Sequence, residues 1–126
     1  MRKRVSAATT AYLLILMIQR YSDEKDRAVR RARFSRKTML RVSGRKTLRE
    51  SFLSQVNDEM VDIGWTMLTI SEGFAMVHID VAESWTLIAS KRITSEIRDL
   101  KSGKLEEDDI LNMLEDDTSD DLSQED

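Results

Sequence analysis

Apolar residues near the N-terminus recur at helical intervals. Residues three and four positions apart are apolar along residues 6–25, which predicts a helix there. This stripe consists of Ala8, Ala11, Tyr12, Ile15 and Ile18. Most residues between them are apolar as well, so the helix needs cover on more than one side, from later elements or from a second chain. We interpret the extra apolar surface as a homodimer interface, formed by Tyr12, Ile15, Leu16 and Ile18.

Basic residues followed by an apolar run can also mark a secretory signal. The uninterrupted apolar run covers only the eight residues from Ala11 to Ile18, whereas about 20 are needed to span a bilayer. No small-residue cleavage site follows the run. We therefore expect a buried first helix in a cytoplasmic protein (nucleoid-associated if bacterial) and no contact with a membrane.

A short second helix is predicted at residues 36–42. Ser35 is a suitable N-cap for it, and Ser43 with Gly44 provides a turn at its end. The charged residues 26–34 are expected to continue the first helix or to connect it to the second.

A third helix is predicted at residues 45–63, because apolar residues step through it by three and four and Gly64 is a suitable C-cap. Its apolar stripe consists of Leu48, Phe52, Val56, Met60 and Ile63. Its first turns contain Arg45, Lys46 and Arg49. The helix dipole disfavours cations at an N-terminus, which hints that these cations bind something.

The remaining pattern predicts a hairpin and further helices. Residues 65–70 and 74–79 are rich in β-formers and flank the sequence Ser71-Glu72-Gly73, which is typical of a hairpin loop. Residues 80–89 have no clear pattern, although Trp85, Leu87 and Ile88 are expected to be partly buried.

Two helices are expected after this segment. Ser90 is a suitable N-cap for a helix at residues 91–102, and a last short helix is expected at residues 106–114. Residues 115–126 are expected to be disordered, because they are almost entirely polar and acidic.

The charges divide the chain into a basic body and an acidic tail. Residues 1–105 carry all 20 Lys and Arg but only 12 Asp and Glu, whereas residues 106–126 carry 11 acidic residues and no basic one. Ten basic residues and no acidic one lie within residues 27–49. A basic body of this kind favours a polyanionic partner. We expect one folded domain at residues 1–105, and a tail that stays solvated, competes for the basic body or docks a protein partner.

The sequence offers little for catalysis or metal binding. Without Cys it has neither disulfides nor thiolate ligands. The single histidine, His78, could form a metal site with Asp80 and Glu83, but one imidazole in a predicted hairpin is more typical of an ordinary strand residue. No phosphate loop, dinucleotide fingerprint or nucleophile elbow is present. We expect no enzymatic activity, metal or cofactor, and we interpret Trp65 and Trp85 as core residues.

Three helices followed by a hairpin, with a basic start to the third helix, resemble a winged helix-turn-helix domain. The resemblance covers about residues 6–80. Within it, the segment before and along the third helix is similar to the turn and recognition helix of bacterial repressors. The residues that carry it are segment 40–50 (LRVSGRKTLRE), Phe52, Val56, Met60, Ile63 and Gly64. Two features depart from the pattern: Gly44 is an extra residue before the third helix, and the wing tip lacks Arg and Lys.

The resemblance implies an α+β winged-helix fold, with a three-helix core and a β-hairpin wing, here followed by a C-terminal helix and the acidic tail. It also implies that the third helix enters the major groove of double-stranded DNA. The implied base-contacting residues are Arg45, Lys46, Thr47 and Arg49. The implied phosphate-contacting residues are Arg31, Arg33, Arg36, Lys37 and Arg41.

These features together predict a dimeric, sequence-specific DNA-binding protein, either a transcriptional regulator or an accessory DNA-binding factor. The alternative is a non-enzymatic adaptor or inhibitor that binds protein partners through the first helix and the acidic tail.

Overall fold

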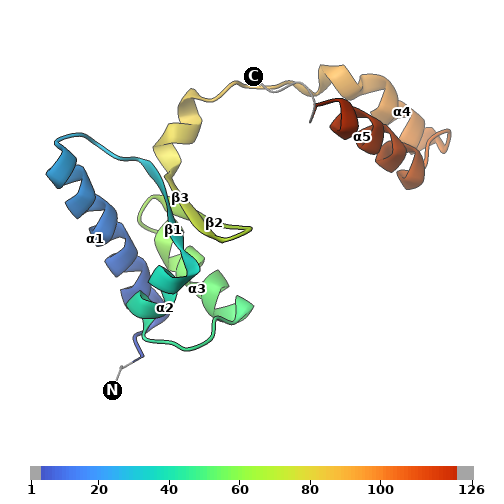
Figure 1. Ribbon diagram of the computed structural model, residues 1–126. Coiled ribbons are helices and arrows are strands. Elements are labelled where there is room, and N and C mark those ends of the chain that lie inside the picture. The colour runs from blue at the N-terminus through green and yellow to red at the C-terminus, as the bar shows by residue number, and fades with distance from the viewer. Residues whose placement is uncertain (1–3, 122–126) are drawn as a thin grey trace. The chain divides into compact units, whose positions relative to one another are not determined.

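The chain packs into two units, which are described separately. This computed structural model describes residues 4–121 (Figure 1). One unit extends from Met1 to Trp85 and the other from Thr86 to Asp126. The sequence pattern places the boundary later, between residues 105 and 106.

The first unit combines helices with a small sheet. In chain order its elements are α1 (Ala7–Lys25), β1 (Arg31–Ser35), α2 (Arg36–Ser43), α3 (Glu50–Val61), β2 (Trp65–Ile70), β3 (Gly73–His78) and the 3-10 helix η1 (Ile79–Ser84). The α+β class, the first two helices and the hairpin are therefore confirmed. None of the helices in the described part of the chain is long and apolar enough to cross a membrane.

The three strands form an antiparallel sheet in the order β1-β3-β2. In this sheet β3 lies between its neighbours: its Phe74 pairs with Phe34 of β1, and its Met76 pairs with Met67 of β2. Because Ile70 pairs with Gly73, the hairpin loop contains two residues rather than the predicted three.

β1 is a strand where the sequence pattern predicts a helix or a connector at residues 26–34, so this prediction is wrong. Its side chains alternate between half-buried, at Ala32 and Phe34, and exposed, at Arg31 and Arg33. The Phe34 ring stacks on the Phe74 ring of β3, with 5.5 Å between the centroids. Only two apolar residues alternate with arginines here, and so short an alternation is not enough to identify a strand from the sequence.

Serine side chains begin two of the helices. The Ser6 hydroxyl accepts a hydrogen bond from the Thr9 N–H at the start of α1, and the Ser35 hydroxyl accepts one from the Thr38 N–H at the start of α2. Gly44 ends α2 in the left-handed conformation, with a φ of 68°. The predicted cap at Ser35 and the predicted turn at Gly44 are confirmed.

The core of the first unit lies between α1, α2, α3 and the sheet. Its largest fully buried apolar side chains are Leu14, Met39, Val56, Met60, Phe74 and Met76. Ile15 and Ile18 belong to the same core, so the prediction that they form a dimer interface is wrong: later elements of the chain cover them. Of the predicted interface residues, Tyr12 and Leu16 remain exposed.

α3 begins at Glu50 and not at Arg45, as the sequence pattern predicts. Arg49 occupies the N-cap position, with an extended backbone and no capping hydrogen bond from its side chain. Within the helix, the predicted apolar stripe is confirmed at Phe52, Val56 and Met60, which are buried. The prediction is wrong at its end, because the C-cap is Asp62 rather than Gly64, and Ile63 lies beyond the helix and is exposed. Leu48 packs against the core from the preceding loop.

The second unit contains two helices joined by a short turn. Its elements are the 3-10 helix η2 (Ser90–Ile93), α4 (Thr94–Ser102) and α5 (Glu107–Asp121). Gly103 ends α4 with a φ of 85°. The two predicted C-terminal helices are therefore present, and the last extends beyond residue 114. Residues 122–126 of the predicted disordered tail lie outside the described residues.

Large apolar residues around the boundary between the units are not buried. Trp85, Leu87 and Ile88 are 55%, 97% and 73% exposed. The prediction that they are partly buried is wrong for Leu87 and Ile88, and Trp85 is not a core residue. Trp65, by contrast, is buried at the start of β2, as predicted.

Candidate nucleic-acid interface

α2 and the loop after it carry most of the cations predicted to bind DNA. Arg36, Lys37 and Arg41 lie on α2, and all three side chains are exposed. The predicted base-contacting residues Arg45, Lys46, Thr47 and Arg49 lie in the loop that precedes α3. The prediction that they occupy the first turns of the third helix is therefore wrong.

Two surface hollows bring these residues together. The first has a volume of about 620 Å³ and is lined by Lys37, Leu40, Arg41, Arg45 and Lys46. The second has a volume of about 290 Å³ and is lined by Arg4, Arg45, Thr47, Arg49, Ser51, Phe52 and Gln55. Arg45 lines both hollows, so they adjoin. We call the cations around them the α2–α3 basic surface: Arg4, Lys37, Arg41, Arg45, Lys46 and Arg49.

Arg45 is held in this surface by contacts within the protein. Its guanidinium lies 3.7 Å from the centre of the Phe52 ring and donates a hydrogen bond of 3.1 Å to the Val5 carbonyl. The Val5 N–H in turn donates to the Ser43 carbonyl at the end of α2. Arg45 therefore links the N-terminal segment, α2 and the first turn of α3, and it is placed to hold the loop rather than to reach a base.

The outer face of α3 adds neutral polar residues that sequence reasoning missed. Ser51, Ser54 and Gln55 are exposed and follow helical spacing on the side opposite the apolar stripe, with the acidic Asp58 at the next turn of the same face. Gln55 lines the second hollow together with Thr47 and Arg49. This face could have been predicted from the helix positions opposite the apolar stripe. It was not, because neutral side chains do not show in a pattern of charges.

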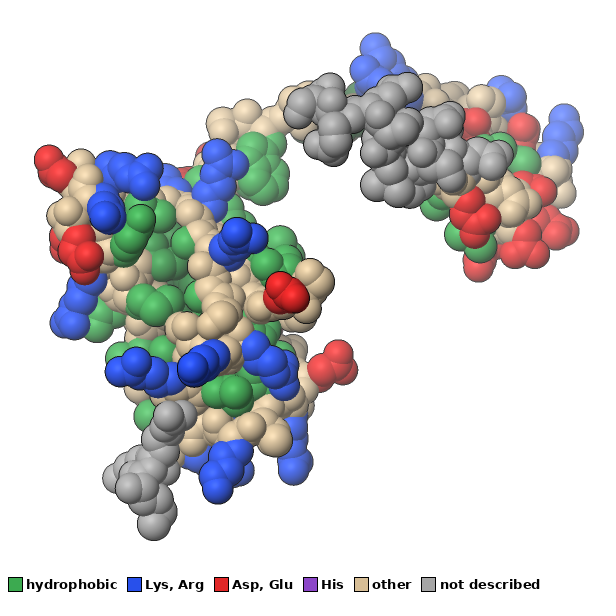
Figure 2. All heavy atoms as spheres, viewed as in Figure 1, with side chains coloured by type: hydrophobic (Ala, Val, Ile, Leu, Met, Phe, Trp, Pro, Cys, Tyr) green, Lys and Arg blue, Asp and Glu red, His purple; other side chains and the backbone are tan. Residues whose placement is uncertain are grey.

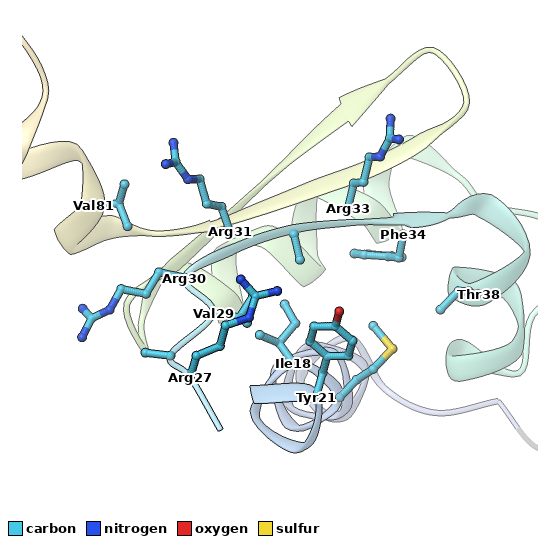
Figure 3. A pocket seen from close by; sticks show the side chains of 13 residues that line it. Ile18, Tyr21, Arg27, Val29, Arg30, Arg31, Arg33, Phe34, Thr38 and Val81 are labelled. Carbon is cyan, nitrogen blue, oxygen red and sulfur yellow. The ribbon is translucent and has the colours of Figure 1, made fainter. Parts of the chain in front are cut away.

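Arg31 and Arg33 line neither of the two hollows. They project from β1 on the side away from α1 (Figure 3). Both residues instead line a separate groove of about 850 Å³ between α1 and β1. Arg27 and Arg30 also line this groove, and its apolar lining includes Ile18, Val29 and Phe34. The structure therefore does not bring Arg31 and Arg33 together with the cations of α2 and the following loop.

Carboxylates do not neutralise the α2–α3 basic surface. Among the described residues, the ion pairs are Arg30–Asp80, His78–Asp80 and Arg98–Asp99, and none involves a cation of this surface. Figure 2 shows a row of Lys and Arg side chains across the face of the first unit that is turned toward the viewer. Cations arranged in this way create a positive potential that attracts a polyanion.

His78 belongs to a small polar cluster at the end of β3. Its Nδ1 lies 2.7 Å from an Asp80 carboxylate oxygen, and Arg30 pairs with the same carboxylate. The hydrogen bond from Arg30, assisted by the one with His78, lowers the pKa of Asp80. The His78 ring packs edge-on against the buried Trp65 ring. The described residues include no group of three or more side chains that could hold a metal ion.

The α2–α3 basic surface and the polar outer face of α3 together offer a site for a ligand on the first unit. A polyanion can be held there by the guanidinium and ammonium groups, while Thr47, Ser51 and Gln55 offer neutral hydrogen bonds beside them. No protein-family model, no curated protein sequence and no solved structure matches this chain.

Proposed function

We propose that the first unit is a winged-helix domain that binds double-stranded DNA. The element order α1-β1-α2-α3-β2-β3 and the strand order β1-β3-β2 fit that fold. In this assignment α2 and α3 form the helix-turn-helix, and the β2–β3 hairpin is the wing. The observation that carries the proposal is the α2–α3 basic surface, whose cations make no ion pair with a carboxylate of the described residues. The protein acts as a transcriptional regulator or an accessory DNA-binding factor.

Base reading is assigned to the end of the loop and the first turns of α3. With α3 in the major groove, Arg49 and Gln55 face the base edges. Arginine can donate two hydrogen bonds to guanine, and glutamine can pair with adenine through one acceptor and one donor. The exposed Lys46 and Thr47 provide further contacts beside them. Arg45 is a positioning residue, because its guanidinium is engaged by Phe52 and Val5.

Phosphate contacts are assigned to α2. Arg36 and Lys37 lie in its first turn, where the backbone N–H groups and the helix dipole also attract anions. Arg41 follows Lys37 by one helical turn and therefore lies on the same side of α2. Arg31 and Arg33 are left out of this set because they lie on β1 and not on α2.

The wing contributes little to this binding mode. Its tip consists of Ser71 and Glu72, both exposed, and carries no cation. The Glu72 carboxylate is repelled by phosphates, so the affinity comes from α2, the loop and α3.

Charge removal from the α2–α3 basic surface tests the proposal. The variant Lys37→Ala/Arg41→Ala should weaken binding to a mixed-sequence duplex by roughly 10-fold or more, because two phosphate contacts and their counterion release are lost. Fluorescence anisotropy with labelled duplex measures this change. The matched control Arg31→Ala/Arg33→Ala removes the same charge from β1, outside both hollows, and should change the affinity by less than about 2-fold. Equal losses in both variants, or no loss in the first, would refute the assignment.

The second candidate function is a protein adaptor or inhibitor built on the same scaffold. It is favoured by the large apolar side chains that α4 and α5 expose. This function requires no DNA contact, so the Lys37→Ala/Arg41→Ala variant would retain the full activity of the protein.

A further inference from the structure

The described part of the second unit exposes most of its large apolar side chains. From residue 86 to residue 115, no described side chain is buried. The exposed residues are Ile93, Ile97 and Leu100 at η2 and α4, and Leu111, Met113 and Leu114 on α5, each between 36% and 56% exposed. A helical hairpin of this size cannot be stabilised without buried apolar surface. The second unit therefore needs cover from another surface.

These residues form a coherent apolar face on α4 rather than scattered points. Ile93, Ile97 and Leu100 are separated by four and three positions, which places them along one side of the helix. The turn that follows is well fixed, because the backbone N–H groups of Lys104 and Leu105 both donate to the Asp99 carbonyl. A contiguous exposed apolar face on a defined helix marks an interaction site.

The segment that contains η2, α4 and the following turn has a net positive charge, whereas α5 is acidic. Within α4 itself two basic and two acidic residues balance, so the positive excess lies in η2 and in the turn. Residues 90–104 contain five basic and two acidic residues, whereas residues 107–121 contain eight acidic residues and no basic one. Lys101 follows Ile97 by one helical turn, and Glu107 precedes Leu111 by one turn, so each charge adjoins the apolar residue of its helix. A fitting partner must therefore present an acidic apolar helix to the segment of residues 90–104 and a basic apolar segment to α5.

We propose that the partner is a second copy of this chain, and that the second units form a two-fold helical bundle. In this dimer α4 of each copy packs against α5 of the other. A second copy supplies both complementary helices at once, since the two-fold arrangement pairs the same surfaces reciprocally. The bundle covers the apolar side chains in its centre and places the opposite charges at its rim. This inference does not depend on DNA binding by the first unit.

Substitution of the apolar face tests the proposal in the full-length chain. Sedimentation equilibrium should give a dimer for the unmodified protein. Ile97→Asp/Leu111→Asp should raise the dimer dissociation constant by roughly 100-fold or more, because two apolar contacts are lost and two charges would be buried. The control Leu87→Asp changes a residue that is 97% exposed before η2 and should leave the dimer intact. A monomeric unmodified protein, or a double variant that still dimerises, would overturn the proposal.

A charge exchange keeps the test informative if the aspartate variant fails to fold. One chain carries Arg98→Glu/Lys101→Glu, and a second carries Glu107→Lys/Asp108→Lys. Each alone should dimerise poorly, because like charges then face each other across the bundle. An equimolar mixture should restore a heterodimer, which mass-tagged chains make visible in native mass spectrometry. If mixing restores nothing, or if each variant alone dimerises like the unmodified chain, α4 does not face α5 of a second copy. Binding of the second unit to a different protein, without self-association, would likewise overturn the proposal.

Discussion

The Arg45 side chain connects three segments of the first unit. Its guanidinium stacks on Phe52 of α3 and donates to the Val5 carbonyl, while the Val5 N–H bonds to Ser43 at the end of α2. A cation–π contact at a partly exposed site contributes about 0.5–1 kcal/mol, and a hydrogen bond from a charged group adds a comparable or larger amount. These contacts fix the loop from which Lys46 and Arg49 project.

Arg45→Ala should lower the free energy of unfolding of the first unit by about 1–2 kcal/mol, because both contacts are lost and the Val5 carbonyl loses its donor. Urea unfolding followed by tryptophan fluorescence, to which the buried Trp65 contributes, measures this loss. The neighbouring Lys46→Ala should change stability by less than about 0.5 kcal/mol, since that side chain is exposed. If Arg45→Ala is as stable as Lys46→Ala and yet abolishes DNA binding, Arg45 contacts DNA directly.

At the scale of the elements, β1 can pair with β3 only because the Gly73 backbone lies very close to the backbone of Phe34. Gly73 begins β3 and pairs with Ser35 at the end of β1. A Cβ at Gly73 would lie 2.4 Å from the Phe34 carbonyl oxygen, which is closer than non-bonded atoms can come. Because the obstacle is backbone, it cannot be relieved by a side-chain rotation. The glycine therefore allows the third strand to join the sheet.

Gly73→Ala should destabilise the first unit by about 1–3 kcal/mol, the usual cost of forcing extra volume into packed structure. Hydrogen exchange should show faster exchange at β1 than at the β2–β3 pairing, because the clash separates β1 from β3. Ser71→Ala, in the exposed hairpin loop, is the matched control and should leave both quantities nearly unchanged. Unaltered protection of β1 in the glycine variant would contradict this reading of the junction.

The helices and the hairpin could be predicted because their signals are local. Spacings of three and four identify α1 and the buried stripe of α3, while Ser35 and Gly44 mark the ends of α2. β1 could not be predicted, since only Ala32 and Phe34 turn inward. Its partner strand is also distant in the sequence, because Phe34 pairs with Phe74, 40 residues later. The start of α3 could not be predicted either. Residues 45–49 are compatible with a helix, but the contacts of Arg45 with Val5 and Phe52 hold this segment as a loop.

The candidate site was predictable only as far as charge identifies it. The cluster of basic residues pointed to Lys37, Arg41, Lys46 and Arg49, which the structure gathers around adjoining hollows. Gln55 carries no charge and was overlooked. The positioning role of Arg45 rests on Phe52 and Val5, and the contact with Val5 spans forty positions of the sequence.

At the scale of the whole molecule, the small net charge of −3 conceals two units of opposite character. In the sequence, the first unit has 15 Lys and Arg against 10 Asp and Glu, and the second has 5 against 13. The basic excess of the first unit suits it to a polyanion, whereas the proposed self-association of the second unit rests on its exposed apolar side chains. Joining two copies through their second units would tether two of the proposed DNA interfaces, which raises the effective concentration of the second interface after the first has bound.

The salt dependence of binding to double-stranded DNA tests the central claim most directly. If α2, the loop and α3 hold phosphates through about four or five cations per protomer, the slope of log K against log salt should be about −4 per bound protomer. The Lys37→Ala/Arg41→Ala variant should reduce the magnitude of that slope by about 2, because two phosphate contacts are removed. A slope near zero for the unmodified protein, or an unchanged slope in the variant, would contradict the assignment of the α2–α3 basic surface as a DNA interface.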